Sequence, residues 1–270
     1  MASQTINVKG IILREAQYGE NDKMLTVLTH ERGKISVHAH GVMKYGSSNF
    51  SFCQMFSYSN FSLYEKSGVF HLKEGSLIES FYDLRKSLDG SALAYYIAET
   101  AVDCSQEDLP EKNILRLVLN SLYCICNSLY PIWQIKGVYE FRLCNEIGFT
   151  PKTALCENCG KPIEGNAVFN ITNGYIRCKE CHTKARDKWD IPISRELEGI
   201  YSNYTSIIEI SYPVTKALGY ISSSDIKRIF SFKLDDSEAV LFSNVCEKYF
   251  LTHIDRTFPS LDFYKKIHIT

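Results

Sequence analysis

The pattern of apolar and polar residues divides the chain into a strand-rich part and a helical part. From Ile6 to about Ser80, short runs of β-branched and aromatic residues alternate with turn-forming glycine, asparagine and aspartate, which is typical of β-strands. These runs occupy residues 8–13, 23–29, 34–42, 55–64 and 70–77. Five short strands in succession predict a small closed barrel.

After residue 83 the apolar side chains recur at helical spacing instead. A first helix is expected from Leu88, a second after the break at Pro110, and a third over residues 132–147, ended by Gly148. Glycines, charges and paired cysteines then replace the periodic pattern up to about residue 188. Helical spacing returns late in the chain, at Leu197, Ile200 and Tyr204 and over residues 240–250.

Two C-x-x-C units carry the clearest chemistry. Cys156 and Cys159 form the first and Cys178 and Cys181 the second, with 18 residues (160–177) between them, which is the spacing of a four-cysteine zinc site. Each unit lets two thiolates of one tight turn face the same point, and two such turns complete a tetrahedron. Four protein ligands leave no position for water, so the expected Zn²⁺, one ion per chain, is structural.

A redox dithiol is the alternative, because a lone C-x-x-C is also the thioredoxin signature. Two matched pairs without a surrounding βαβ pattern favour zinc. Asn173 and Gly174 predict a two-residue hairpin turn between the pairs. Arg177 and the lysines nearby would offset the negative charge of four thiolates.

Composition narrows the class of protein. The 30 basic and 31 acidic residues nearly cancel, so any nucleic-acid contact must come from a local patch. The apolar stretches are too interrupted to span a membrane, and residues 1–10 lack the apolar core of a secretory signal. Ten cysteines scattered over the chain fit reduced thiols. We therefore expect a soluble cytoplasmic protein.

No arrangement of residues argues for catalysis, since phosphate-loop, nucleophile-elbow and zinc-protease motifs are absent from the sequence. His38 and His40 alternate along an expected strand, so both imidazoles point to one face, where they could join a metal site. No third ligand is close to them in the sequence, which favours a polar surface or a DNA-facing role. Glu20 and Asp22 are expected to close a turn. We predict that the protein is not an enzyme.

Two stretches of the sequence resemble the bacterial DNA repair protein RecO family. The first comprises GIILR at 10–14, YGENDK at 18–23, LTHERGKI at 28–35 and Gly41. The second is FRLCNEIGFTP at 141–151, which leads into CENCG at 156–160. The similarity in order and spacing extends from residue 6 to about residue 185.

The resemblance implies an α+β multidomain fold. Its parts are an N-terminal five-stranded OB-fold barrel at residues 1–81, a helical domain at 82–150 and 189–270, and an inserted four-cysteine zinc ribbon at 151–188. It also implies a recombination mediator that binds single- and double-stranded DNA, anneals complementary strands, and works with RecR and single-stranded-DNA-binding protein to load RecA. Such a protein would act at the nucleoid.

An OB-fold holds a single strand in a basic groove and stacks bases on aromatic side chains. The basic candidates are Arg14, Lys23, Arg32, Lys34, His38, His40 and Lys44. The candidate stacking residues are Phe50, Phe52, Tyr58 and Tyr64, although aromatic residues at period two are also typical of a barrel core. Residues 42–48 depart from the family by carrying one lysine in place of several basic residues. That departure would either weaken DNA affinity through this loop or shift it toward Lys161, Arg177, Lys179, Lys184, Arg186 and Lys188.

The resemblance also implies a site on the helical domain for the acidic, phenylalanine-ending tail of single-stranded-DNA-binding protein. An apolar groove rimmed by cations would suit such a peptide, and Arg116, Lys136 and Arg142 are the basic candidates on the expected helices. The alternative function is a protein-interaction scaffold, in which the barrel and the zinc ribbon bind only proteins. The near-zero net charge and the depleted loop favour that alternative.

Overall fold

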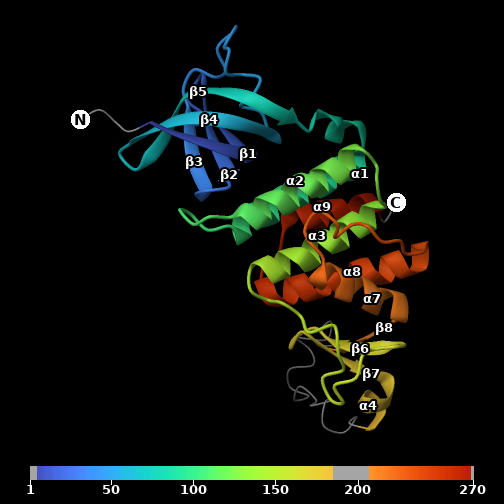
Figure 1. Cartoon of the computed structure of the whole chain (residues 1–270). Coiled ribbons are helices and arrows are strands. Elements are labelled where there is room, and N and C mark those ends of the chain that lie inside the picture. The colour runs from blue at the N-terminus through green and yellow to red at the C-terminus, as the bar shows by residue number, and fades with distance from the viewer. Residues whose placement is uncertain (1–4, 185–206, 269–270) are drawn as a thin grey trace, which may run out of the picture. The chain divides into compact units, whose positions relative to one another are not determined.

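The computed structural model describes residues 5–184 and 207–268 of the chain (Figure 1). The chain folds into two compact units, one formed by Met1–Ile132 with Thr257–Thr270 and one by Trp133–Arg256. None of the helices in the described ranges combines the length and the apolar character needed to cross a bilayer.

The first unit begins with a five-stranded barrel. Its strands are β1 (Thr5–Tyr18), β2 (Asp22–Thr29), β3 (Gly33–Ala39), β4 (Ser57–Lys66) and β5 (Val69–Ser80). They close in the order β1-β2-β3-β5-β4, with only the β3–β5 pairing parallel (Figure 1). Because successive side chains of a strand alternate between its faces, every second one points inward. The core of the barrel includes Val8, Ile12, Leu25, Val27, Ile35, Val37, Phe61 and Leu63. The predicted closed barrel is confirmed.

Several barrel strands differ in length from the prediction, and β1 and β3 show why. β1 extends to Tyr18, because the residues beyond Leu13 continue to pair with β2 after a register shift between Ile12 and Arg14. β3 ends at Ala39, because the chain turns at Gly41, whose φ of 63° favours glycine. Pairing with β2 therefore sets the end of β1, and the turn at Gly41 sets the end of β3.

The rest of the first unit is helical, with η1 (Tyr82–Lys86), α1 (Leu88–Cys104), α2 (Lys112–Cys126) and α9 (Pro259–His268). Ser87 caps α1 by accepting the Gly90 N–H at 3.1 Å. The distant α9 packs on α1, where the rings of Tyr96 and Phe258 lie 6.0 Å apart. Gly33 meets the loop after α1 so closely that a Cβ there would lie 2.3 Å from the Gln106 carbonyl oxygen.

The second unit contains α3 (Ile132–Glu146), α7 (Tyr212–Ser223) and α8 (Asp236–Ile254). Every residue of α3 from Gln134 to Phe141 is buried, so this helix forms the centre of the unit. Gly137 permits the close approach of α8, because a Cβ at this position would lie 2.5 Å from the Phe242 ring.

A small sheet completes the second unit. Its strands β6 (Ala167–Asn170), β7 (Tyr175–Cys178) and β8 (Ile207–Ile210) lie in the order β7-β6-β8, and α4 (Lys179–Lys184) follows β7. The predicted hairpin forms, but its connection has four residues, 171–174, instead of the predicted two, because β6 ends at Asn170. Gly174 in this connection has φ +67°. The third strand was not predicted, because β8 is only four residues long and comes from a distant part of the sequence. The helical spacing at 197, 200 and 204 lies outside the described residues.

Candidate metal centre and nucleic-acid interface

The first cysteine pair lies in a tight turn before β6. The Cys156 N–H donates to the Lys161 carbonyl at 2.8 Å, and the Gly160 N–H donates to the Cys156 carbonyl at 2.9 Å. Gly160 adopts φ +69°, a left-handed conformation that glycine enters without steric cost. The chain therefore reverses within a few residues and brings the side chains of Cys156 and Cys159 to the same side.

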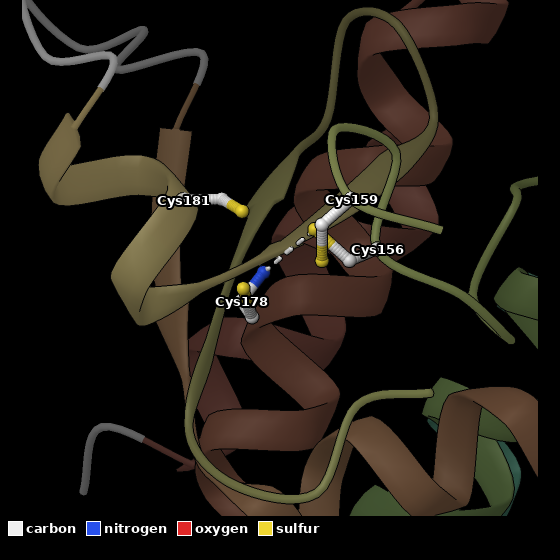
Figure 2. A group of neighbouring side chains, drawn as sticks. All are labelled: Cys156, Cys159, Cys178 and Cys181. Atoms are coloured by element: carbon white, nitrogen blue, oxygen red, sulfur yellow. Dashed lines mark hydrogen bonds between the residues drawn. The ribbon is translucent and has the colours of Figure 1, made fainter. Parts of the chain in front are cut away.

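The second pair spans the junction of β7 and α4. Cys178 ends the strand and Cys181 lies in the first turn of the helix. The Cys178 N–H donates to the Cys156 sulfur at 3.4 Å, which joins the two turns directly (Figure 2). Figure 2 shows the four sulfur atoms gathered in the space between the first turn and the β7–α4 junction.

The four sulfur atoms lie within 4.8 Å of one another. Tetrahedral zinc with Zn–S bonds of about 2.3 Å would place neighbouring sulfurs about 3.8 Å apart, so the cluster needs little adjustment to receive an ion. All four cysteines are free thiols. The donor set therefore fits a four-coordinate thiolate site for a soft or borderline dication such as Zn²⁺.

The thiols compete for ionisation. Burial raises the pKa of Cys156, but N–H donors from Cys159, Cys178 and Asn158 outweigh burial and lower that pKa to about 6. Desolvation and the neighbouring thiols of Cys181 and Cys156 raise the pKa of Cys178 to about 12. One thiolate thus suppresses the next, as expected for like charges in one site. A bound dication would remove this conflict and favour the deprotonated state of every sulfur.

A part-buried ion pair lies beside the sulfur cluster, and a buried tyrosine packs against the sheet of the same module. Arg177 on β7 is 8% exposed and donates from Nε and Nη2 to Glu157 Oε2, between the ligands of the first pair. The Arg177 guanidinium is therefore engaged by Glu157 within the module. The ring of Tyr249 on α8 lies 5.3 Å from the ring of Phe169 on β6, measured between centroids, and the Tyr249 hydroxyl donates to the Phe149 carbonyl at 3.1 Å. These contacts attach the small sheet to the helices of the second unit.

The structure places the predicted DNA-binding residues in different environments. Arg14 on β1 and Lys44 in the loop after β3 are exposed. Lys23 is 8% exposed, and its ammonium lies 2.9 Å from Glu15 and 3.4 Å from the Cys53 carbonyl. An enclosed and paired cation does not line an open groove, so the prediction for Lys23 was wrong. Lys23 shares the inward face of β2 with Leu25 and Val27, so the period-two pattern already carried a signal for its burial.

Arg32 and Lys34 turn toward the helical part of their own unit. Arg32 pairs with Asp108 at 3.1 Å and lies over the Phe70 ring, while Lys34 donates to the Val102 carbonyl at 2.9 Å. The Lys34 ammonium is therefore engaged by the backbone of its own unit. The Arg32–Asp108 pair lies at the surface, with side-chain exposures of 41% and 73%, so Arg32 remains a predicted DNA contact.

The two histidines meet a third polar side chain that the sequence analysis did not connect with them. Asp22 Oδ2 lies 2.8 Å from His38 Nε2 and 2.9 Å from His40 Nδ1. The Gly41 N–H and both imidazoles hold the pKa of the Asp22 carboxyl well below its usual range. His38 is thus tied to a carboxylate. The expectation that no third ligand is near the histidines was wrong, because pairing of β2 with β3 closes a gap of 16 residues.

The aromatic candidates also separate by burial. Phe52 is 4% exposed and belongs to the barrel core, so its predicted role as a stacking platform was wrong. Tyr64 stacks on His71 with ring centroids 5.2 Å apart, and Tyr58 is half-buried. Phe50 is 51% exposed. Tyr45, which was not among the predicted residues, is fully exposed beside Lys44. Its turn-rich neighbourhood was the signal that could have identified it.

Of the three predicted partner-binding residues, Arg116 is exposed on α2. Lys136 is 2% exposed and lies between Glu140 and Glu247 at 2.8 and 2.7 Å, so the prediction that it rims a surface groove was wrong. Arg142 pairs with Glu146 at 2.7 Å and donates to carbonyl groups at the end of α7. Its guanidinium joins two elements of the unit.

Comparisons with known proteins cover nearly the whole chain. Residues 1–81 match the family described as "Recombination protein O N terminal", and residues 85–262 match "Recombination protein O C terminal". The chain is 27% identical over 262 residues to the "DNA repair protein RecO" of Acetivibrio thermocellus, covering 97% of each chain. It is 33% identical over 186 residues to the protein of that name from Bacillus subtilis, covering 68% of this chain and 71% of the relative. On these matches, the chain belongs to the RecO family.

Proposed function

We propose that this protein is a DNA-binding recombination mediator. Membership of the RecO family supports a role in DNA repair and recombination. The finer proposal is that it binds single- and double-stranded DNA, anneals complementary strands and helps RecR load RecA at the nucleoid. The single observation that carries the proposal is the match of both halves of the chain to one recombination family. The closed five-stranded barrel also suits single-strand binding, because barrels of this kind bind single strands along a basic and aromatic surface.

The proposed single-strand contact lies on the exposed part of the barrel unit. Arg14 and Lys44 keep exposed side chains, and the loop after β3 adds exposed aromatic rings at Tyr45 and Phe50. Cations neutralise phosphates while aromatic faces stack on bases, and stacking tolerates any sequence. This set replaces the buried Lys23 and Phe52 with residues that a strand can reach.

We propose that the four-cysteine cluster holds one structural Zn²⁺. Four sulfurs fill a tetrahedral shell, so the ion would supply no Lewis-acid chemistry. Its role would be to keep the module around Cys156 and Cys178 folded, since metal binding and folding are coupled in such sites. The protein would accordingly act by binding and not by catalysis.

The proposed protein partners are RecR and the tail of single-stranded-DNA-binding protein. Of the predicted basic residues, Arg116 retains an exposed position from which to meet an acidic peptide. The internal contacts of Lys136 and Arg142 described above remove them from this proposal.

Strand annealing tests the proposal. Complementary oligonucleotides coated with the cognate single-stranded-DNA-binding protein should anneal faster when the protein is added, and a labelled single strand should bind at low salt. For single strands, each phosphate contact contributes about 0.7 to the slope of log affinity against log salt, so Lys44→Ala should flatten the slope by roughly that amount. Tyr45→Ala should lose about 1–3 kcal/mol of affinity, the contribution of one stacked base.

Lys216→Ala is the matched control, because Lys216 is an exposed lysine on α7 in the other unit. It should leave DNA affinity and its salt dependence unchanged. Absence of binding at low salt, together with absence of annealing, would reject the mediator and favour the protein-interaction scaffold.

A further inference from the structure

A second cluster of metal-ligating side chains lies on the barrel, away from the cysteines in sequence. Asp22 begins β2, His38 lies in β3 and His40 follows the end of that strand. Antiparallel pairing sets Lys23 opposite Ala39 and Met24 opposite His38. Because strand side chains alternate between faces, His38 and His40 share one face, and the start of β2 brings Asp22 to them.

The three side chains converge on one point. One ligand atom from each lies within 4.8 Å of the others, and both imidazoles approach the same oxygen, Asp22 Oδ2, at 2.8 and 2.9 Å. The other oxygen of this carboxylate accepts the Gly41 N–H at 2.8 Å. The backbone therefore orients the carboxylate, as outer-shell hydrogen bonds do for metal ligands, and leaves Oδ2 directed at the two rings.

One side of the cluster is fixed and the other is open. The His38 side chain is 18% exposed, and its ring packs edge-on against Tyr18 at 5.2 Å and against His71 at 5.1 Å. The His40 side chain is 74% exposed. A small ion can reach the cluster from the His40 side, while the packing of His38 maintains the geometry.

We propose that Asp22, His38 and His40 form a second metal site, which takes a first-row transition dication such as Zn²⁺ or Co²⁺. Two imidazole nitrogens and one carboxylate oxygen suit these ions, whereas Mg²⁺ and Ca²⁺ prefer oxygen ligands alone. Three protein ligands leave a fourth position for water, unlike the closed cysteine site.

The required adjustment is small. Metal–nitrogen and metal–oxygen bonds of about 2.0–2.1 Å in a tetrahedron place neighbouring ligand atoms about 3.3 Å apart. The present contacts of 2.8 and 2.9 Å are hydrogen-bond lengths, so Oδ2 must separate from each of the two ring nitrogens by about half an ångström. A small shift of the Asp22 carboxylate, with a movement of the exposed His40 side chain, supplies this separation while His38 keeps its packing.

Cobalt titration of the full-length, tag-free protein tests the site. The cysteine cluster is first filled with Zn²⁺, and Co²⁺ is then added while calorimetry gives the stoichiometry and absorption gives the ligand type. We expect one further equivalent per chain, with the visible bands of nitrogen- and oxygen-bound cobalt and no new sulfur-to-cobalt charge-transfer band. His40→Ala and Asp22→Asn should weaken this uptake at least tenfold.

His30→Ala is the matched control. His30 Nδ1 also lies beside a carboxylate, 3.3 Å from Glu31, but the pair is not part of the three-ligand cluster, so this variant should bind cobalt like the parent. Since His40 is exposed, its removal tests the site even where Asp22→Asn fails to fold. The proposal is overturned by the absence of uptake beyond the cysteine site, or by equal uptake in a folded His40→Ala variant.

Discussion

Replacing the buried Lys136 with methionine should strongly destabilise the second unit. The Lys136 ammonium lies 2.8 Å from Glu140 and 2.7 Å from Glu247, with side-chain exposures of 2%, 0% and 14%. At these separations and an effective dielectric constant of about 20, each attraction amounts to roughly 6 kcal/mol. Desolvation of the ions offsets much of that gain, but methionine leaves the carboxylates buried without their cation. We therefore expect a loss of about 3–5 kcal/mol in the free energy of unfolding.

Urea unfolding, followed by circular dichroism and by tryptophan fluorescence, measures the loss from the shift of the midpoint. In a unit of this size the same loss should lower the melting temperature by about 6–20 °C. The double variant Lys136→Met with Glu140→Gln should recover part of the stability, because it removes one of the stranded charges.

The exposed pair of Lys86 and Asp83 is the matched control. Its atoms lie 2.9 Å apart at (i, i+3), close to the buried contact in length, but the side chains are 72% and 50% exposed. Lys86→Met should cost no more than about 1 kcal/mol. If Lys136→Met lowers the free energy of unfolding by as little as Lys86→Met does, burial does not set the strength of the ion pair.

Three further predictions follow from charges, sulfurs and close backbone contacts. Burial alone would lower the pKa of Lys136, but its two carboxylates raise it. The difference in free energy of unfolding between the parent and Lys136→Met should therefore persist up to about pH 10 and shrink as pH rises through the raised pKa. Urea midpoints measured across this pH range check the prediction. Cys156→Ser should reduce the zinc content from one equivalent per chain to well below one, as measured by atomic absorption on protein purified without added metal. A parent protein that already lacks zinc contradicts the proposed zinc site. Gly33→Ala should lower the melting temperature by more than Gly19→Ala. A Cβ at Gly33 would lie 2.3 and 2.4 Å from two carbonyl oxygens, whereas a Cβ at Gly19, also at positive φ, would meet nothing within 4 Å. Equal losses would mean that the backbone conformation alone sets the cost.

Local sequence patterns determined much of the fold. Alternating apolar residues and turn-forming glycines predicted the strands of the barrel, because a strand exposes alternate faces whatever its partners are. The spacing of Cys156, Cys159, Cys178 and Cys181 predicted a common site, since two residues between thiols are enough to form one tight turn. These signals are local, so the order of residues carries them without knowledge of the tertiary structure.

Contacts between distant residues were decided only by the tertiary structure. No local pattern indicated that Lys136 is buried, because a carboxylate of another helix, Glu247, makes the burial of its ammonium tolerable. Lys23 alternates with the core residues Leu25 and Val27, but its carboxylate partner Glu15 lies on a different strand and is met only through pairing. Pairing between distant segments likewise places β8 beside β6 and brings Asp22 to its two histidines. Ordering distant segments against each other depends on long-range packing and pairing, and residue order alone does not reveal which segments will meet.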